Sequence, residues 1–415
     1  RRSSDLANEL YDYMGVPPGI AGTTINNLHG RAYNLLHNDW FRDENLQDSV
    51  VVDTDDGPDT MTDYVLLRRG KRRDYFTSCL PWPQKGPAVE LPLGTEAPIT
   101  GLAKANTSYP LVNQGGLRET DGTAANVTYA SAVAAGGDSN FLLEEDPNNA
   151  GFPNIRADLS QAAAATINQL RESFQIQRLY ERDARGGTRY VELLQSHFKV
   201  TSPDYRLQRP EFLGGSSTYV NINPVAQTSE AGTTPQGNLS AFGTVSNTGK
   251  GFVKSFTEHG VIIGLASIRA DLTYQQGLDR MWSRQTRFDY YWPTLAHLGE
   301  QAVLNKEIYL QGTAGGTADD AVFGYQERYA EYRYKNSQIT SQFRSSFAQS
   351  LDLWHLSQDF GSLPTLNSTF IVENPPIDRV VAVPSQPDFI LDCYFNVRCA
   401  RPMPTYSVPG LIDHF

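Results

Sequence analysis

The chain has 415 residues, with 35 lysines and arginines against 46 aspartates and glutamates and a formal net charge of −11. An acidic surface of this kind repels nucleic acid as a whole, so any such contact must come from a local basic patch. No stretch approaches the roughly 18 apolar residues of a membrane span, and three scattered cysteines exclude a disulfide framework or a zinc site. The many glycines, prolines and aromatic residues predict a loop-rich, β-leaning chain with inserted helices.

The first predicted helix covers residues 31–45. Ala32, Leu36 and Trp40 recur there at four-residue steps, which is the spacing of one helix face. The following residues 53–63 are acidic and rich in turn-forming residues, but they lack the complete loop pattern of a calcium site. This favours a solvated turn, with a calcium site as the alternative.

A basic run follows in this acidic chain. It consists of Arg68, Arg69, Lys71, Arg72 and Arg73. Such a run is usually a solvated loop or a set of partners for carboxylates such as Asp43 or Asp63, but on a surface facing DNA it would contact phosphates. Tyr75 and Phe76 follow closely and could stack on bases. These seven basic and aromatic residues are the candidate nucleic-acid site.

Two long stretches show little periodicity. Residues 94–153 are rich in glycine, alanine, threonine, serine and asparagine, which is typical of an exposed functional loop or of disorder. Residues 214–251 are similar but shorter, and we expect a loop there as well.

The longest helical pattern covers residues 156–200 and predicts a helical hairpin. Gly186 and Gly187 are expected to end the first helix, and a second helix fits residues 190–198. We expect Leu170, Phe174 and Phe198 to be buried against the body of the subunit or against a neighbouring copy. The hairpin's one histidine, His197, is expected to have no carboxylate or thiol partner.

Strands are expected towards the C-terminus. Residues 261–266, within 259–271, are apolar on both faces and predict a strand buried on both sides, and residues 380–383 form another candidate. Residues 389–399 alternate most clearly between apolar and polar side chains. Between these stretches lies an aromatic and basic segment, which predicts a subunit interface because tyrosine and arginine are enriched at interfaces. Its candidate residues are Tyr325, Arg328, Tyr329, Tyr332, Arg333 and Tyr334.

The sequence contains no recognisable catalytic motif, so we predict no enzyme, no metal and no cofactor. Two other functional classes stay open at this stage. One is a cellular β-sandwich module that binds glycans through aromatic loops, and the other is a hydrolase whose site is assembled from distant residues.

Five collinear segments carry a family resemblance. They are WFRDENLQDSVVVD (residues 40–53), LLRRGKRRDYFTSCLPWPQKG (66–86), ATINQLRESFQIQRLYERDARGGTRY (165–190), FGYQERYAEYRY (323–334) and RPMPTYSVPGLIDHF (401–415). The chain resembles the major capsid protein of microviruses, small tailless single-stranded DNA phages, and is most similar to the gokushovirus branch. The resemblance implies a viral jelly roll, an eight-stranded antiparallel β-barrel of two Greek keys with long loop and helical insertions.

The resemblance also implies an organisation and a function. Residues 1–415 would form one capsid domain that lacks an N-terminal section of the family sequence, with residues 94–153 as a variable surface insertion used in host attachment and residues 156–200 as a helical insertion. Copies would form a T=1 icosahedral virion shell around a circular single-stranded DNA genome, assembled in the bacterial cytoplasm. The implied partners are a small basic DNA-binding virion protein, an internal scaffolding protein, a minor or pilot protein and a host-surface receptor.

Overall fold

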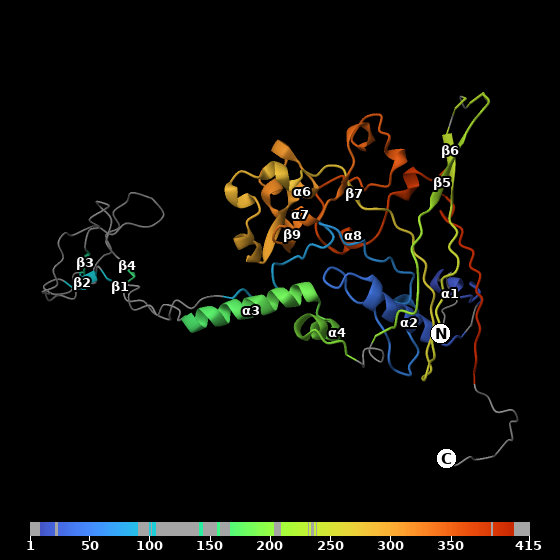
Figure 1. The fold of residues 1–415 in the computed structure, drawn as a ribbon, viewed down its shortest axis with the longest axis horizontal. Coiled ribbons are helices and arrows are strands. Elements are labelled where there is room, and N and C mark those ends of the chain that lie inside the picture. Colours follow the sequence, from blue (N-terminus) through green and yellow to red (C-terminus); the bar gives the residue numbers. More distant parts are fainter. Residues whose placement is uncertain are drawn as a thin grey trace, which may run out of the picture.

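The structure is a computed structural model, and Figure 1 shows its fold. It describes residues 9–20, 24–89, 99–100, 102–104, 141–143, 156–157, 167–202, 209–230, 232–233, 236–237, 239–382 and 385–401. Helix α3 extends from one side of the central body, and the hairpin of β5 and β6 stands at the opposite side. Most of residues 94–153 therefore lies outside the described residues.

The helices of the described residues are short, with one exception. The α-helices are α1 (Glu9–Tyr13), α2 (Leu28–Leu36), α3 (Ile167–Gly186), α4 (Tyr190–Leu193), α6 (Asn305–Ile308), α7 (Ala330–Arg333) and α8 (Ser368–Ile371). Two π-helical turns, His37–Phe41 and Leu194–Phe198, continue α2 and α4 directly. The 3₁₀ turns are Met61–Asp63, Arg280–Ser283, Arg287–Asp289, Pro293–His297, Gly312–Ala314, Ala318–Asp320, Ser341–Phe343, Asp352–Trp354 and Ile377–Arg379.

The strands pair two by two. They are β1 (Ile99–Thr100), β2 (Leu102–Lys104), β3 (Phe141–Leu143), β4 (Arg156–Ala157), β5 (Asn221–Ala226), β6 (Leu239–Thr244), β7 (Thr273–Tyr274), β8 (Glu300–Leu304), β9 (Val322–Glu327) and β10 (Ser337–Gln338). The pairs β1–β4, β2–β3, β5–β6 and β8–β9 are antiparallel, and β7–β10 is parallel. Within the described residues no barrel closes and helix exceeds strand, so the jelly roll stays a prediction.

The main hydrophobic core lies around β8 and β9. Alternate residues of β8 are buried, and Val303 is completely covered. The core consists of Tyr75, Phe76, Cys79, Tyr274, Val303, Ile308, Phe323, Ala330, Leu366 and Phe370. A smaller core joins α1 and α2 through Leu10, Tyr11, Tyr33 and Tyr64. The core beneath β8–β9 fixes the surfaces on which the candidate sites stand.

The β5–β6 hairpin is longer than its two named strands. Asn221 pairs with Thr244 at their outer end. Three residues beyond Thr244, the Asn247 side chain donates a hydrogen bond to Ser216, and further out Glu211 and Lys254 form an ion pair of 2.9 Å. Glu211 lies as far before Asn221 as Lys254 lies after Thr244, so the two arms still lie side by side there, although the strand pairing itself covers only 221–226 and 239–244. The expectation of a loop at residues 214–251 was therefore wrong for residues 221–226 and 239–244, which form β5 and β6.

The helices predicted at residues 31–45 and 156–200 are both present in the described structure, at least in part. The helix predicted at residues 31–45 is confirmed over residues 31–41 by α2 and its π-helical extension, and residues 42–45 are not helical. The helical hairpin is confirmed over the described residues 167–198, and Gly187, with φ of 87°, takes the left-handed conformation that ends α3. Its expected start near residue 158 lies outside the described residues.

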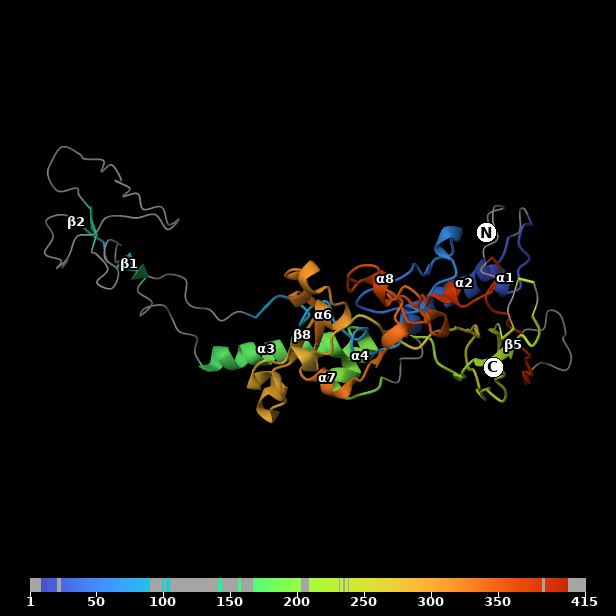
Figure 2. The same cartoon turned by 90° about the horizontal axis from the view of Figure 1, so that it is seen from above.

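The three strands predicted near the C-terminus are absent from the described structure. Residues 259–271 and 389–399 have no strand assignment, and Ile390 is 99% exposed. Residues 380–382 follow a 3₁₀ turn, and residue 383 lies outside the description. In both views the segment 385–401 runs beside the β5–β6 hairpin (Figures 1 and 2). A strand requires a hydrogen-bonded neighbour, and the described residues supply none to these segments.

Candidate nucleic-acid and subunit contacts

The backbone of the basic run is held in place by residues 371–373. Lys71 donates its backbone N–H to the carbonyl of Ile371 at 2.8 Å, and Glu373 donates its own to the carbonyl of Arg69 at 2.9 Å. An antiparallel bridge joins Gly70 and Val372 between them. The run is therefore part of the body and its side chains have fixed starting points.

Two cations of the run are paired with carboxylates. Arg72 lies 2.8 Å from Asp271, and both side chains are exposed. Arg73 lies 2.8 Å from Asp43, whose side chain is only 3% exposed. The carboxylate-partner interpretation thus fits these two residues, including the named partner Asp43.

Two further arginines of the run meet neutral acceptors. Arg68 donates to the side chain of Asn374, and Arg69 donates to Ser267 Oγ at 2.9 Å. Arg69 also lies over the ring of Phe41, 5.2 Å from its centroid. Neither acceptor neutralises a positive charge, so Arg68 keeps its charge for an external anion, whereas the charge of Arg69 is offset in part by the nearby carboxylate of Glu373.

Lys71 is buried, in contrast to its neighbours. Its Nζ donates to Gln358 Oε1 at 2.7 Å and lies 4.5 Å from the ring centroid of Phe370. Burial lowers the pKa of Lys71 to about 8, although the nearby carboxylates of Glu373 and Asp74 oppose the shift. In this conformation the Lys71 ammonium group is engaged inside the chain and offers nothing to a phosphate.

Tyr75 and Phe76 lie in the main core, each 4% exposed, so the expectation that they stack on bases does not fit this structure. The Phe76 ring packs edge-on against Tyr274, with centroids 4.7 Å apart. The Tyr75 hydroxyl donates to Glu307 Oε2 at 2.9 Å. An aromatic pair after a basic run has the same sequence pattern whether its rings face solvent or the core. In this structure both rings are packed in the core.

The six residues predicted as a subunit interface fall into three groups. Tyr329 is buried, and its hydroxyl donates to the carbonyl of Tyr290 at 3.0 Å, while Tyr325 exchanges backbone hydrogen bonds with Leu80. Tyr332 and Arg333 are exposed. The first group holds this chain together, and the second is free to meet another molecule. Arg328 and Tyr334 are half-buried.

Sequence reasoning missed a neighbouring aromatic surface at residues 284–292. The Tyr291 ring packs edge-on against Tyr329, with centroids 5.1 Å apart, and Arg284 lies 4.5 Å from the ring centroid of Tyr332. The exposed rings of this surface belong to Phe288, Tyr290, Tyr291 and Trp292. The sequence signal was present, since four aromatic residues occur within five positions, but no period identified the segment as an element.

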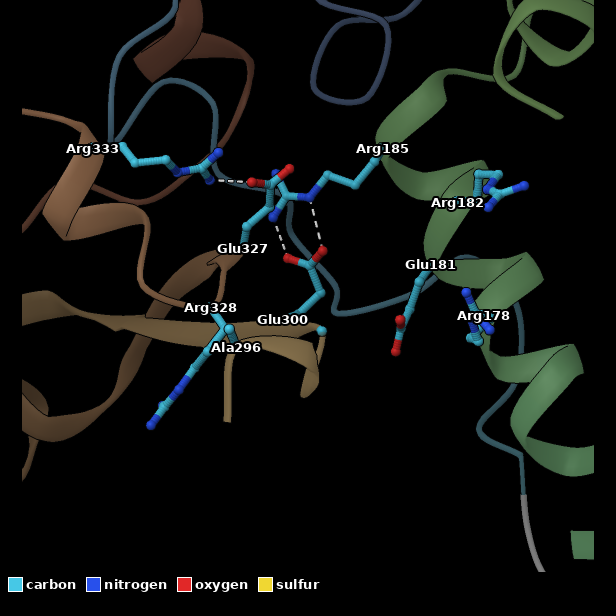
Figure 3. Close-up of a pocket in the computed structure, with 10 residues that line it drawn as sticks. Arg178, Glu181, Arg182, Arg185, Ala296, Glu300, Glu327, Arg328 and Arg333 are labelled. Atoms are coloured by element: carbon cyan, nitrogen blue, oxygen red, sulfur yellow. Dashed lines mark hydrogen bonds and ion pairs between the residues drawn. The ribbon is translucent and has the colours of Figure 1, made fainter. Parts of the chain in front are cut away.

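An arginine-lined cleft of about 460 Å³ lies between α3 and the β8–β9 hairpin (Figure 3). We call it the arginine cleft. Its lining residues are Arg178, Glu181, Arg182, Arg185, Ala296, Gly299, Glu300, Glu327, Arg328 and Arg333. α3 lies beside the β8–β9 sheet in both overall views (Figures 1 and 2).

Ion pairs neutralise part of the arginine cleft. Arg185 makes a bidentate pair with Glu300, whose side chain is 6% exposed, and Arg333 pairs with Glu327 (Figure 3). Arg178 and Arg182, one helical turn apart on α3, have no ion-pair or hydrogen-bond partner among the described residues. The four-residue spacing of these two arginines in the sequence indicates that they share one helix face. The residues that line the opposite side of the cleft come from positions 296–333, more than 100 residues later in the chain.

The turn of the helical hairpin is attached to the body by Glu44. Thr188 donates its N–H and its hydroxyl to Glu44 Oε1 at 2.7 and 2.6 Å, and Arg189 lies 3.2 Å from the other oxygen. These contacts outweigh burial and lower the pKa of Glu44 to about 2. The expectation for His197 was wrong, because its Nε2 lies 2.6 Å from Asp183 Oδ1 across the hairpin.

The expected burial of the hairpin's apolar residues does not occur within the chain. Leu170, Phe174 and Phe198 are 37%, 61% and 71% exposed. The amphipathic pattern of α3 is real, but the part of the helix that carries Leu170 and Phe174 extends beyond the body (Figure 1). We expected either the body of the subunit or a neighbouring copy to cover these three side chains. In the described structure the body does not cover them.

Neither a metal cluster nor a membrane-crossing helix occurs in the part of the chain that the structure describes. No group of three histidine, cysteine, aspartate or glutamate side chains is arranged to hold a metal, and Arg31 pairs with Asp59 in the acidic turn. Among the described helices, none has the length and apolar character that crossing a bilayer requires.

Comparisons with known proteins identify the family. The profile of a family described as "Capsid protein (F protein)" matches residues 5–411. Capsid protein VP1 of Bdellovibrio phage phiMH2K is 52% identical, over 98% of this chain and 76% of that protein. Capsid protein VP1 of Chlamydia phage 1 is 47% identical, over 97% and 77%, and capsid protein VP1 of Spiroplasma virus 4 is 39% identical, over 97% and 76%.

The match extends over almost the whole chain and confirms the resemblance to microvirus capsid proteins. It gives no support to a glycan-binding module or a hydrolase. The chain belongs to the phage capsid protein family, and it is a structural protein of the virion rather than an enzyme.

Proposed function

We propose that copies of this chain assemble into a closed T=1 icosahedral shell around a circular single-stranded DNA genome. The observation that carries the proposal is the family match over residues 5–411. The exposed apolar surface of the single chain supports it, because soluble monomers rarely leave large apolar side chains uncovered over contiguous areas. Tyr394, Phe395 and Val397, for example, are 91%, 76% and 73% exposed.

We infer that the shell wall is a jelly roll that the described residues form only in part. The β5–β6 hairpin exposes Ile222, Val225 and Phe242, although an isolated two-stranded hairpin is at best marginally stable in water. The segment 389–399 has the alternation of a strand and lies beside this hairpin in Figures 1 and 2. Further strands, from residues outside those described or from another copy, would complete the sheet and cover these side chains.

For the subunit contacts we propose the exposed face of α3 and the exposed part of the aromatic segment. Leu170 and Phe174 lie one helical turn apart on the free part of α3. Tyr332 and Arg333 are the members of the predicted interface that remain exposed. A neighbouring copy is the occupant that a closed shell supplies to both surfaces.

For the genome we propose that Arg68, Arg69, Arg72 and Arg73 contribute phosphate contacts. A chain with a net charge of −11 cannot neutralise a genome by itself, so a small basic virion protein would supply most of the positive charge. An internal scaffolding protein and a minor or pilot protein complete the proposed partners. Phosphate contacts would make binding by these arginines independent of sequence.

For host attachment we propose residues 94–153. Their small polar composition suits an exposed loop, and most of them lie outside the described residues. Deleting the segment is expected to leave shell assembly intact and to abolish binding to the host receptor. Failure of particles to form would assign the segment an architectural role instead.

The central experiment is electron microscopy of the chain expressed alone and with its virion partners. Uniform spherical particles, hollow or filled with DNA, are the expected result. A monodisperse monomer in the presence of all partners would contradict the proposal. Nuclease treatment followed by sequencing of the protected DNA would establish whether the enclosed genome is circular and single-stranded.

A further inference from the structure

We propose that the arginine cleft and the exposed rings of residues 288–292 form a binding site for single-stranded DNA, separate from the basic run. The phosphate backbone would lie in the cleft, and one or more bases would stack on the rings. The inference rests on the proposed enclosure of a single-stranded genome. It adds the location and chemistry of a contact that sequence reasoning placed elsewhere.

Arginine outnumbers glutamate in the lining of the cleft. Five arginines line it against three glutamates, although the whole chain carries a net charge of −11. The ion pairs of Arg185 and Arg333 leave Arg178, Arg182 and Arg328 without a carboxylate partner among the described residues. In Figure 3 the Arg328 side chain points away from α3, and its guanidinium meets the carbonyl of Phe288. Arg178 and Arg182 therefore supply unpaired positive charge on the α3 wall of the cleft, and Arg328 supplies it on the side that leads to the exposed rings.

In the described structure, Arg328 is held by neutral groups only. Its backbone N–H donates to the carbonyl of Gly299 at 2.8 Å, and its Nη2 donates to the carbonyl of Phe288 at 3.1 Å. Its Nε is buried and finds no acceptor among the described residues. Its guanidinium lies 4.7 Å from the ring centroid of Tyr329. Arg328 is thus held in place by neutral groups and keeps its full charge for a ligand.

The exposed rings of residues 288–292 lie next to the cleft. Arg328 touches Phe288, and the 3₁₀ turn that begins at Pro293, directly after Trp292, supplies the cleft residue Ala296. Phe288 and Tyr291 are 55% and 53% exposed. A basic groove flanked by exposed aromatic rings is the arrangement with which proteins bind single strands without sequence preference.

The lining of the cleft favours nucleic acid over a second copy of the chain. The cores of protein interfaces are depleted in charged residues, because desolvating charge is costly. Eight of the ten residues that line this cleft are arginine or glutamate. A phosphodiester remains partly hydrated when it binds, and guanidinium groups match its oxygens with paired hydrogen bonds. An open, charged cleft therefore suits a DNA strand better than a dry protein contact.

The test measures binding of a fluorescein-labelled oligo-dT of about 12 nucleotides, within the site sizes typical of single-strand binding. The full-length purified chain is titrated at several salt concentrations and followed by fluorescence anisotropy. The charge variant is the double substitution Arg178→Ala and Arg182→Ala, which breaks no ion pair of the described structure. The matched control is Arg171→Ala, an exposed arginine of α3 that does not line the cleft.

Loss of two phosphate contacts is expected to make the slope of log affinity against log salt less steep by about 1.4. The ring variant Phe288→Ala is expected to weaken binding by at least about fivefold, because base stacking on an aromatic ring contributes on that scale. Phe288→Tyr keeps a ring and should restore most of the affinity. Phe347→Ala removes a phenylalanine of similar exposure elsewhere and should leave binding unchanged.

Each outcome supports or overturns the site. Unchanged affinity and salt slope in the arginine and ring variants would overturn it, and shells that still form and fill with DNA would leave the proposed function intact. Normal oligonucleotide binding with failed assembly would also overturn it and make the cleft a contact between copies. Failure of the wild-type chain to form shells would contradict the proposed function, independently of the oligonucleotide measurement.

Discussion

Arg185, in the last turn of α3, donates two parallel hydrogen bonds from Nε and Nη2 to the carboxylate of Glu300 at the start of β8. Its Nη1 donates to Gln326 Oε1 at 3.3 Å. The Glu300 side chain is 6% exposed and that of Arg185 is 23% exposed. The pair fastens the projecting helix to the sheet above the main core. It therefore sets the direction in which α3 leaves the body.

We expect Arg185→Ala to destabilise the subunit by about 3 kcal/mol, because it leaves a largely buried carboxylate without its partner. The free energy of unfolding, measured by urea denaturation of purified subunits, checks this. Arg333→Ala is the control, since its pair with Glu327 is exposed and should contribute less than about 1 kcal/mol. Equal effects of the two substitutions would show that Glu300 is not effectively buried.

Phe76→Ala is expected to lower the free energy of unfolding by about 3–5 kcal/mol, the usual cost of truncating a buried phenylalanine. The ring contacts Tyr274 and Phe323 in the main core. Oligonucleotide affinity of the folded fraction should not change. A variant of normal stability but weak DNA binding would restore the stacking role that the sequence suggested.

Phe174→Ala is expected to change the free energy of unfolding of the subunit by less than about 0.5 kcal/mol, because the side chain is 61% exposed on the single chain. Assembly should fail or require a higher subunit concentration, as judged by sedimentation and microscopy. Glu172→Ala, an exposed polar residue of the same helix, serves as the control. Normal assembly of the Phe174 variant would remove this face from the shell contacts.

Lys71 should make the stability of the subunit depend on pH. Its pKa is about 8 in the folded state against an ordinary value of 10.5, so the unfolded chain holds more protons between these two values. The free energy of unfolding therefore rises with pH across this window, by on the order of 3 kcal/mol in full. Lys71→Met should remove that rise, as measured by urea denaturation from pH 7 to pH 10. Parallel curves for the two proteins would contradict the burial of the ammonium group.

Arg72→Glu tests the basic run more cleanly than reversal of Arg73. Arg72 and Asp271 are both exposed, whereas reversal of Arg73 would place a second carboxylate beside the nearly buried Asp43. We expect intact shells with a reduced DNA content, quantified by the ratio of absorbance at 260 and 280 nm. Lys250→Glu makes the same charge change at an exposed loop and should fill normally. A normal genome content in the Arg72 variant would limit the run to pairing with carboxylates.

Sequence reasoning succeeded where a structure is determined by neighbours in the chain. α3 was predictable because its apolar residues recur at helical spacing and Gly187 can adopt the left-handed turn that ends it. The strand expected at residues 389–399 has an equally clear pattern, but a strand also needs a partner from elsewhere. Local alternation contains no information about whether that partner is present.

The candidate sites show the same division. The basic run was visible in the sequence, yet only the fold places Lys71 against Phe370 and Arg73 against Asp43. Arg182 and Arg328 line the same cleft although they are nearly 150 positions apart in the sequence. A local sequence motif therefore could not have predicted the arginine cleft. Long-range packing decides which charges face each other and which remain free.

The open edges of the β5–β6 hairpin have a consequence for the time before a subunit joins a shell. Unpaired backbone groups along an extended ladder are a template for any other chain, and apolar side chains on both sides of the ladder strengthen such mispairing. A newly made subunit is therefore prone to associate with other chains through this hairpin, and more so as its concentration rises. Competition between correct capture and aggregation, more than folding of the single chain, would then set how many particles each infected cell yields.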